Sequence, residues 1–367
     1  MGEQAPKSIL RRLRAAGYEA WYVGGCVRDT LLGRPVHDWD ITTSALPEEV
    51  TALFAKTIPT GIRHGTVTVL EDGAKAEVTT YRADGQYLDG RHPAAVTFVR
   101  SLPEDLARRD FTVNAMAMDE DGTLVDLYGG RADLAAKLLR CVGDPTRRFE
   151  EDALRMLRAV RFAAQLGFTI ESETAAAIVR CAPLAERLSA ERVSEELQKT
   201  LLSPRPELVG QMAAWELLRP YGLLEARALA WIAALPAEPT VRFAALKQVY
   251  PEADLSALRL PRRIIQDAAA VSAVERPRDR LAWKRLIAAL GKERGRLAGM
   301  LFGEADQVEE ILASGECLSL KELAVTGADF PERSGAAVGA HLQALLAHVL
   351  EHPEANRREI LLTLAAP

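Results

Sequence analysis

Two aspartates separated by one residue, Asp38 and Asp40, have a spacing that suggests chemistry. If this segment is a strand, both side chains project from one face, because successive side chains of a strand alternate. Adjacent carboxylates repel each other unless a cation lies between them, and proteins commonly hold Mg²⁺ with one or two carboxylates plus substrate phosphates. The pair therefore predicts a magnesium site, and a solvated acidic turn is the alternative.

A pair of glycines upstream predicts a turn that binds phosphate. Gly24 and Gly25 follow a β-prone segment, residues 18–23, and precede a short helix expected over residues 26–32. The start of a helix offers free backbone N–H groups to an anion, and Arg28 in its first turn adds a guanidinium group. We therefore expect this turn to contact a phosphorylated substrate.

A third carboxylate, Glu77, lies on a later segment. Residues 66–70 and 76–81 are expected to form a β-hairpin around Asp72 and Gly73. Glu77 on its second strand is a candidate to join the two aspartates, and an exposed strand side chain is the alternative. The polar, aperiodic residues 82–98 that follow predict a functional loop.

The apolar segment 151–167 predicts a buried helix with one polar stripe. Internal salt bridges are one interpretation of that stripe, but its three arginines outnumber its single aspartate. The stripe therefore also predicts a bound triphosphate nucleotide, and an aspartate beside an arginine offers the donors and acceptor needed to recognise a base edge. The residues recur every three positions, which places them on one helix face: Asp152, Arg155, Arg158 and Arg161.

Composition narrows the class of protein. The 367 residues are 48% hydrophobic and 26% charged, with a net charge of −5, as in ordinary globular proteins. No apolar run reaches the roughly 18 residues of a membrane span, so we expect no membrane partner. The four cysteines are widely spaced, which favours a cytoplasmic protein without disulfides or zinc. Residues 251–300 hold eleven basic and six acidic residues, a weak indication of polyanion binding.

The order of predicted elements indicates the fold class. Strands and helices alternate up to about residue 140, and the remainder is almost entirely helical. We therefore expect an α+β head with a small mixed sheet, followed by an all-α remainder.

Four motifs together resemble the family of class II tRNA nucleotidyltransferases and bacterial poly(A) polymerases. Their order and spacing span roughly residues 15–200. The resemblance implies a nucleotidyltransferase head over residues 1–139, a helical neck over 140–203, a helical body over 204–265 and a helical, tRNA-binding tail over 266–367. The motifs are Gly24-Gly25-x-Val27-Arg28-Asp29, Asp38-x-Asp40, Arg108-Arg109-Asp110-Phe111-Thr112-x-Asn114-Ala115 and Glu151-Asp152-x-x-Arg155.

The resemblance also implies roles for individual residues. Asp38 and Asp40 would bind Mg²⁺, with Glu77 as a supporting carboxylate. Asp152 and Arg155 would select cytosine or adenine, and residues 186–199 would brace their helix. The triphosphate and the rest of the nucleotide would contact a further set, with Asp110 near the ribose: Gly25, Arg28, Arg109, Arg158 and Arg161.

The implied activity is template-independent addition of CCA to the 3′ end of tRNA from CTP and ATP, with release of pyrophosphate. Gly61-x-x-His64-Gly65 resembles the tRNA-directed branch, and the loop around Asp89-Gly90-Arg91 resembles the full-length loop of CCA-adding members. An enzyme that adds only the terminal A, a poly(A) polymerase and a non-catalytic RNA-binding protein remain alternatives. Monomer and homodimer are both open.

Overall fold

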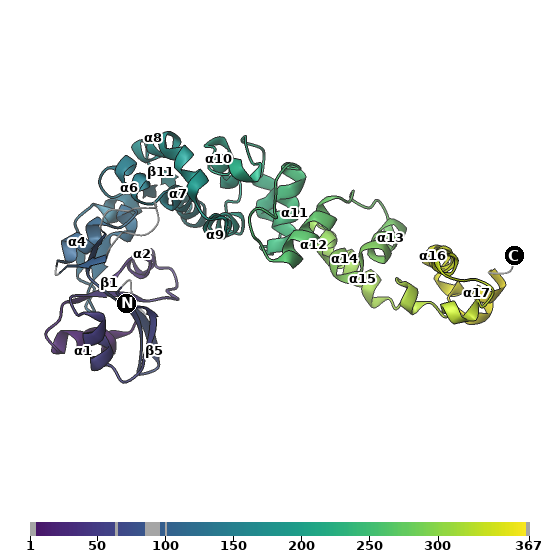
Figure 1. Ribbon diagram of the computed structural model, residues 1–367, viewed down its shortest axis with the longest axis horizontal. Helices are drawn as coiled ribbons and strands as arrows, with labels where there is room; N and C mark the ends of the chain where they lie inside the picture. The colour runs from purple at the N-terminus through teal and green to yellow at the C-terminus, as the bar shows by residue number, and fades with distance from the viewer. Residues whose placement is uncertain (1–4, 63–64, 85–95, 100, 365–367) are drawn as a thin grey trace. The chain divides into compact units, whose positions relative to one another are not determined.

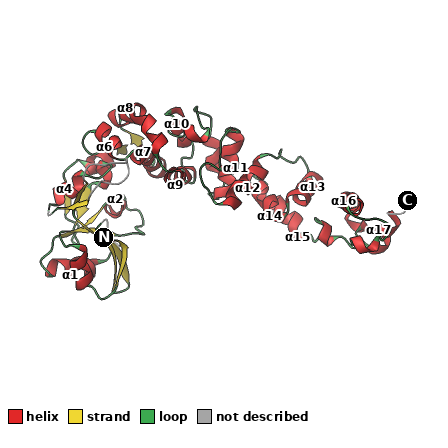
Figure 2. Cartoon of the chain, viewed as in Figure 1, coloured by secondary structure: helices red, strands yellow, loops and turns green. Residues whose placement is uncertain are grey.

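The computed structural model describes residues 5–62, 65–84, 96–99 and 101–364. The chain divides into two compact units, residues 1–226 and 227–367. Within the described residues, every strand lies in the first unit, and the second contains helices (Figure 2). This confirms an α+β head followed by a mostly helical remainder. The finer division into head, neck, body and tail stays a prediction.

A mixed seven-stranded sheet forms the framework of the head, in the order β3-β4-β5-β2-β1-β8-β9 (Figure 1). β2 pairs in parallel with β5, and the other neighbours are antiparallel. The predicted hairpin is confirmed as β4 and β5. The strands are β1 (Ala20–Val23), β2 (Asp40–Thr43), β3 (Thr57–Gly61), β4 (Thr66–Glu71), β5 (Ala74–Thr80), β8 (Met116–Met118) and β9 (Leu124–Asp126).

Short helices connect and cover these strands. α1 buries Ile9, Leu10 and Leu13, which places its apolar stripe in the core of the head. α2 begins directly after the glycine turn, as expected from the sequence. The helices of the head are α1 (Lys7–Ala15), α2 (Gly25–Leu31), α3 (Pro47–Leu53), α4 (Leu102–Ala107), the 3₁₀ turn η2 (Thr112–Asn114) and α5 (Gly130–Ala135).

Two sequence-based expectations need correction here. The segment 82–98 is not irregular throughout, because its ends pair as antiparallel strands β6 (Arg82–Asp84) and β7 (Val96–Phe98); residues 85–95, with Asp89-Gly90-Arg91, lie outside the described residues. Residues 133–139, for which the sequence favours a helix, are helical only as far as Ala135, because Leu138–Leu139 forms β10, which pairs in parallel with β11 (Thr169–Ile170).

The helix expected over residues 151–167 begins later than expected, at Leu154, and Glu151 is the last residue of the preceding helix. α6 ends at Glu151, Asp152 adopts an extended conformation (φ −145°, ψ 104°), and α7 begins at Leu154. The Asp152 carboxylate accepts a hydrogen bond from the Leu154 N–H at 3.1 Å, a local bond that competes with helix continuation. The helices of this region are α6 (Pro145–Glu151), α7 (Leu154–Leu166), α8 (Ser172–Cys181), α9 (Ala190–Leu201) and α10 (Leu208–Ala214).

The second unit consists of helices packed around apolar side chains such as Trp283, which is 1% exposed. In the described part of the chain, no helix is both long and apolar enough to cross a membrane. The helices are α11 (Pro239–Val249), α12 (Arg262–Ser272), α13 (Arg280–Leu290), α14 (Lys292–Phe302), α15 (Ala305–Ala313), α16 (Ala336–Glu351) and α17 (Arg358–Leu364).

The basic excess of residues 251–300 is smaller in the folded unit than in the sequence. Several of its cations form ion pairs with carboxylates from residues 304–351, which lie outside that window. Arg276 pairs with Glu304, and Arg280 with Glu316 at 2.7 Å. Lys292 pairs with Glu322 at 2.5 Å. Local charge in the sequence therefore overestimates the positive surface available to a polyanion.

Candidate nucleotide-binding site

The predicted carboxylates meet at one place on the sheet. Asp40 begins β2, and its direct partner on the parallel strand β5 is Glu77. Asp38 does not share the strand, contrary to expectation, because it lies in an exposed bend just before β2, but its charge still acts on Asp40. Trp39 between them is buried, with its ring centre 4.9 Å from that of Tyr22. The structure therefore brings together the two aspartates and the glutamate that the sequence singled out.

The electrostatics of this cluster favour a bound cation. Burial raises the pKa of Asp40 to about 6, and the neighbouring Glu77 and Asp38 also raise it, while Arg109 lowers it. Among the described residues, no group of three or more Asp, Glu, His or Cys side chains could enclose a metal ion by itself. The cluster thus fits an ion that takes its remaining ligands from substrate oxygens and water.

The glycine turn lies directly beside this cluster. Gly24 has a φ of +73°, and a Cβ atom there would lie 3.1 Å from Arg109 Nη1 and 3.7 Å from Asp40 Oδ2. The positive φ favours glycine here, and a side chain would in addition crowd the Arg109 guanidinium. The turn leads into α2, where Arg28 is buried and donates to Asn114 Oδ1 at 2.7 Å and to Asp29.

Arg109 is held in place by Asp105, a residue to which the sequence analysis assigned no role. Asp105 is fully buried and accepts hydrogen bonds from Arg109 at 3.1 Å and from Arg108 at 2.9 Å. Burial would raise the pKa of Asp105, but Arg109 and Arg108 outweigh it and hold the pKa below its usual range. The sequence did carry a signal for this contact, because Asp105 precedes Arg108 by three residues and Arg109 by four, which is the spacing of ion pairs on a helix.

Asp105 contacts β2 as well as Arg109. Thr42 Oγ1, two residues after Asp40 on β2, lies 3.2 Å from Asp105 Oδ2. The Nε atom of Arg109 is buried and has no hydrogen-bond partner in the described structure. Because an unpaired buried donor is costly, this atom is suited to an acceptor on a bound substrate.

The arginine stripe of α7 surrounds one aromatic ring. The guanidinium carbons of Arg28, Arg158 and Arg161 lie 5.3, 5.2 and 3.9 Å from the centre of the Phe162 ring. Cation–π contacts of this kind orient guanidinium groups and do not require a counter-ion. Arg28 from α2 and two arginines of α7 therefore form one cluster of guanidinium groups around Phe162.

The expectation that this stripe carries unmatched positive charge is wrong for the folded chain. Its three arginines find carboxylates on separate segments. Arg155 donates to Glu151 at 2.8 Å, and Arg158 donates to Asp110 at 2.7 Å. Arg161 pairs with Glu196, which is 4% exposed. A bound nucleotide would thus interact with arginines that are already oriented by these partners.

Asp110, expected near the ribose, belongs to this same arrangement. Burial would raise its pKa, but Arg158 and a hydrogen bond from Asn114 lower it to about 2. Asn114 in turn accepts from Arg28 at 2.7 Å. Asp110 therefore connects the arginine of α7 to the arginine of α2 through one asparagine.

The two residues predicted to recognise the base, Asp152 and Arg155, are each held by hydrogen bonds from or to other segments. Asp152 accepts from Arg192 of α9 at 2.9 Å, and Arg155 donates to the backbone carbonyls of Arg108 at 2.9 Å and Arg148 at 3.1 Å. α9 thus supplies Arg192 to Asp152 as well as Glu196 to α7. This agrees with the expectation that residues 186–199 brace the helix carrying the stripe.

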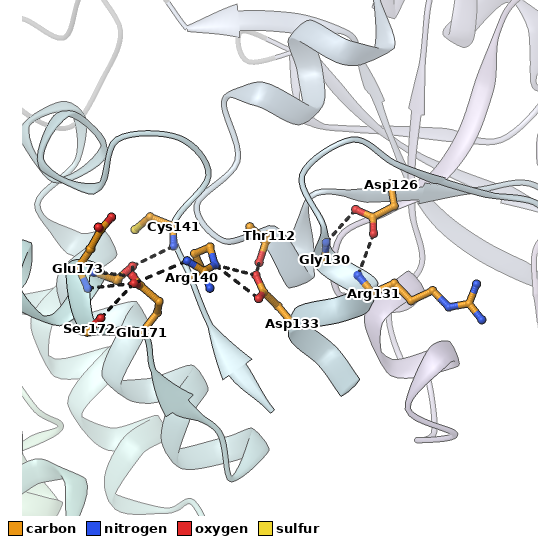
Figure 3. A network of polar contacts seen from close by, with 11 residues as sticks. Thr112, Asp126, Gly130, Arg131, Asp133, Arg140, Cys141, Glu171, Ser172 and Glu173 are labelled. Atoms are coloured by element: carbon orange, nitrogen blue, oxygen red, sulfur yellow. Dashed lines mark hydrogen bonds and ion pairs between the residues drawn. The ribbon is translucent and has the colours of Figure 1, made fainter. Parts of the chain in front are cut away.

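A polar network behind the site connects η2 to the following helices (Figure 3). Thr112 Oγ1 donates to Asp133 Oδ2 at 2.7 Å, and Arg140 lies 3.3 Å from Asp133 and 3.6 Å from Glu171. Glu171 caps α8 by accepting from the backbone N–H of Thr174 at 2.8 Å. The segment that carries Asp110 and Asn114 is therefore connected to α5 and to the start of α8.

Comparisons with known proteins agree with this geometry. Residues 20–140 match the model of the poly A polymerase head domain, and residues 167–227 match that of the probable RNA and SrmB-binding site of polymerase A. The chain is 48% identical over 281 residues to a CCA-adding enzyme of Geobacillus thermodenitrificans, covering 74% of this chain and 70% of that protein.

Two further comparisons extend over nearly the whole chain. A CCA-adding enzyme of Enterococcus faecalis is 38% identical over 99% of this chain and 95% of its own length. A crystal structure of the Bacillus stearothermophilus CCA-adding enzyme in complex with CTP is 36% identical and superposes with a TM-score of 0.82, covering 96% of this chain and 94% of that one. The chain therefore belongs to the CCA-adding enzyme family of nucleotidyltransferases.

Proposed function

We propose that this chain adds CCA to the 3′ end of tRNA, using CTP and ATP without a nucleic-acid template. The observation that carries this proposal is the position of Asp40, which has Glu77 as its strand partner and lies beside Arg109 and the Gly24 turn. Carboxylates for a metal ion and donors for phosphate thus lie together. The similarity to CCA-adding enzymes along nearly the full chain supports the choice of substrates.

We propose that Asp38 and Asp40 hold Mg²⁺, with Glu77 as the supporting carboxylate. Bound Mg²⁺ would lower the pKa of the attacking hydroxyl and neutralise charge on the phosphates. The tRNA 3′ oxygen forms a bond to the α-phosphorus while the bond from that phosphorus to the bridging oxygen breaks, so pyrophosphate leaves. The 3′-hydroxyl proton is released to solvent.

The chain's own residues bind and orient the nucleotide. The backbone at Gly25 and the guanidinium of Arg28 would contact the triphosphate at the start of α2. Arg109, whose Nε has no hydrogen-bond partner among the described residues, would contact the nucleotide beside Asp40. Arg158 and Arg161, packed around Phe162, would also contact the nucleotide. Such preoriented charges contribute more to phosphoryl transfer than mobile ones.

Asp152 and Arg155 would select the base. A carboxylate accepts from the amino group of cytosine or adenine, and a guanidinium donates to a ring nitrogen of either. Uracil and guanine place a carbonyl where that amino group would be, so two acceptors would meet. The pair would thus admit CTP and ATP and reject UTP and GTP.

Three tRNA transcripts test the proposed reaction. They end before the CCA, after one C and after both C residues, and each is incubated with Mg²⁺ and with CTP or ATP alone. We expect C addition to the first two and A addition to the third. Addition of A to the third without C addition to the others would indicate an enzyme for the terminal A only, and no incorporation would contradict the proposal.

We place this activity in the cytoplasm. All four cysteines are buried and free of disulfides: Cys26, Cys141, Cys181 and Cys317. Free cysteines are typical of proteins in a reducing compartment.

A further inference from the structure

A cavity of about 510 Å³ lies at the C-terminal end of α7. It is bounded by α2 and the residues that follow it, by Gln165 at the end of α7, and by Lys199 with Ser203 at the end of α9. Arg28 lines it as well, so the cavity adjoins the nucleotide-binding residues. Its other lining residues belong to neither the carboxylate cluster nor the arginine stripe.

The lining of this cavity favours an anion. Arg28, Arg34 and Lys199 contribute three positive charges, and the acidic residue among its lining residues, Asp29, is already paired with Arg28 at 2.9 Å. Among the described residues, the Arg34 guanidinium has one hydrogen-bond partner, the backbone carbonyl of Gln165, at a long 3.3 Å. Lys199 pairs with Glu195 on the helix surface, where such a pair is weak. Arg34 and Lys199 therefore retain most of their capacity to bind a ligand.

The cavity lies at the phosphate end of the proposed nucleotide site. Arg155, in the base-recognition pair, is at the start of α7, whereas Gln165 is at its end, ten residues or about 15 Å along the helix axis. Between them, Arg158 and Arg161 surround Phe162 together with Arg28. A nucleotide with its base at Asp152 and its phosphates at Arg28 would therefore point its terminal phosphates toward the cavity.

We propose that this cavity receives inorganic pyrophosphate after the displacement step. In an in-line reaction the leaving group departs on the side of the α-phosphorus opposite the attacking 3′ oxygen, so the cavity next to Arg28 lies on the product side. Arg34 and Lys199 would then bind the charge that the breaking bond leaves on pyrophosphate. This inference rests on the proposed function.

The test compares wild type with the Arg34→Gln/Lys199→Gln double variant. The first measurement is inhibition of ATP incorporation into tRNA ending in CC by added pyrophosphate, and the second is calorimetric binding of pyrophosphate without tRNA. We expect the inhibition constant and the dissociation constant for pyrophosphate to rise about tenfold, since two charge-assisted contacts are lost. The KM values for ATP and tRNA should change less than about twofold, because neither residue is assigned to the substrates.

A matched control is the Lys75→Gln/Arg180→Gln double variant. It removes the same two charges from exposed positions on β5 and α8, outside the cavity. It should bind pyrophosphate like wild type, and an equal loss would show a general effect of net charge and overturn the proposal.

Three other outcomes would also overturn it. Unchanged pyrophosphate constants in the Arg34→Gln/Lys199→Gln variant would show that the cavity does not hold the product. A rise in the KM for ATP by the same factor would place the intact triphosphate there, and a rise in the KM for tRNA alone would place the RNA end there. If wild type incorporates neither CTP nor ATP, the proposed function fails, and the calorimetric measurement still tests the cavity.

Discussion

The carboxylates of Asp40 and Glu77 lie side by side because β2 and β5 run parallel and pair these two residues directly. The two strands are separated in the sequence by α3 and the β3–β4 segment, so this proximity depends on the sheet. The result is a partly buried negative cluster in which the pKa of Asp40 is raised to about 6 by burial and by its acidic neighbours. Such a cluster favours a bound cation, and the ionised carboxylates destabilise the folded chain when no cation is bound.

We expect Asp38→Ala and Asp40→Ala to abolish nucleotide incorporation with the fold intact. Each variant should be slower than wild type by at least about 10³-fold, because metal-assisted charge stabilisation contributes several kcal/mol to phosphoryl transfer. Single-turnover incorporation of CTP measures the rate, and circular dichroism checks the fold. Near wild-type turnover in a folded variant would contradict the metal-binding role.

Asp40→Asn should be inactive and yet more stable than wild type when divalent ions are removed. The pKa of Asp40 is about 6 in the folded chain, above its ordinary value of 3.8, so the folded state favours the protonated form. Its stabilising contribution is present below about pH 4 and is lost as the pH rises through 6. At pH 7 the variant should gain on the order of 2 kcal/mol in the free energy of unfolding.

Urea unfolding of both proteins in EDTA, from pH 4 to pH 7.5, measures this difference. The gap between variant and wild type should widen with pH, and added Mg²⁺ should narrow it by stabilising only the wild type. A difference in unfolding free energy that does not depend on pH would show that the ionised Asp40 carboxylate does not destabilise the fold.

Glu196→Gln should reduce both stability and nucleotide affinity. Glu196 is the buried partner of Arg161, and its loss leaves a buried guanidinium without a counter-charge, at a cost of about 3 kcal/mol. Arg161 would also lose its orientation beside Phe162 and hence its position toward the nucleotide. Urea unfolding and ATP binding provide the measurements, and Glu186→Gln, an exposed change nearby, is the control.

Asp152→Ala should relax the choice of base. Removal of the carboxylate eliminates the repulsion of a carbonyl on uracil or guanine, a mismatch worth roughly 1–3 kcal/mol for each unpaired group. UTP and GTP should be accepted better while CTP and ATP are used less well. Arg155→Ala should weaken all four. If Asp152→Ala slowed CTP and ATP and still rejected UTP and GTP, base recognition would reside elsewhere.

The ion pairs of the second unit indicate which of its arginines are available to bind tRNA phosphates. Arg262 and Arg278 are exposed and form no ion pair with another described residue, unlike Arg276. Arg262→Glu/Arg278→Glu should raise the KM for tRNA and lower its salt dependence, with the KM for ATP unchanged. Arg276→Glu alone should have a smaller effect on tRNA. An unchanged tRNA KM across a salt series would show that these arginines only face solvent.

The sequence alone allowed correct predictions wherever a short stretch carried its own signal. The glycine turn before α2, the hairpin around Asp72 and Gly73 and the change to helix near residue 140 depend on local backbone preferences, which adjacent residues express directly. The candidate residues Asp38, Asp40, Arg28 and the arginines of α7 were singled out from equally local signals, namely a spacing of two or three residues or a helix start after paired glycines, and their roles stay predictions.

Only the tertiary structure showed which charges neutralise each other. The partners of Arg158 and Arg161 are Asp110 and Glu196, which lie 48 and 35 residues away in the chain. The structure also showed that the chain leaves the helical conformation at Asp152, whose carboxylate accepts a hydrogen bond from the Leu154 N–H. The spacing of apolar residues in this segment gave no sign of that interruption. A sequence specifies which charges are present, but their energies depend on distance and burial, and these are set when strands and helices distant in the chain pack together.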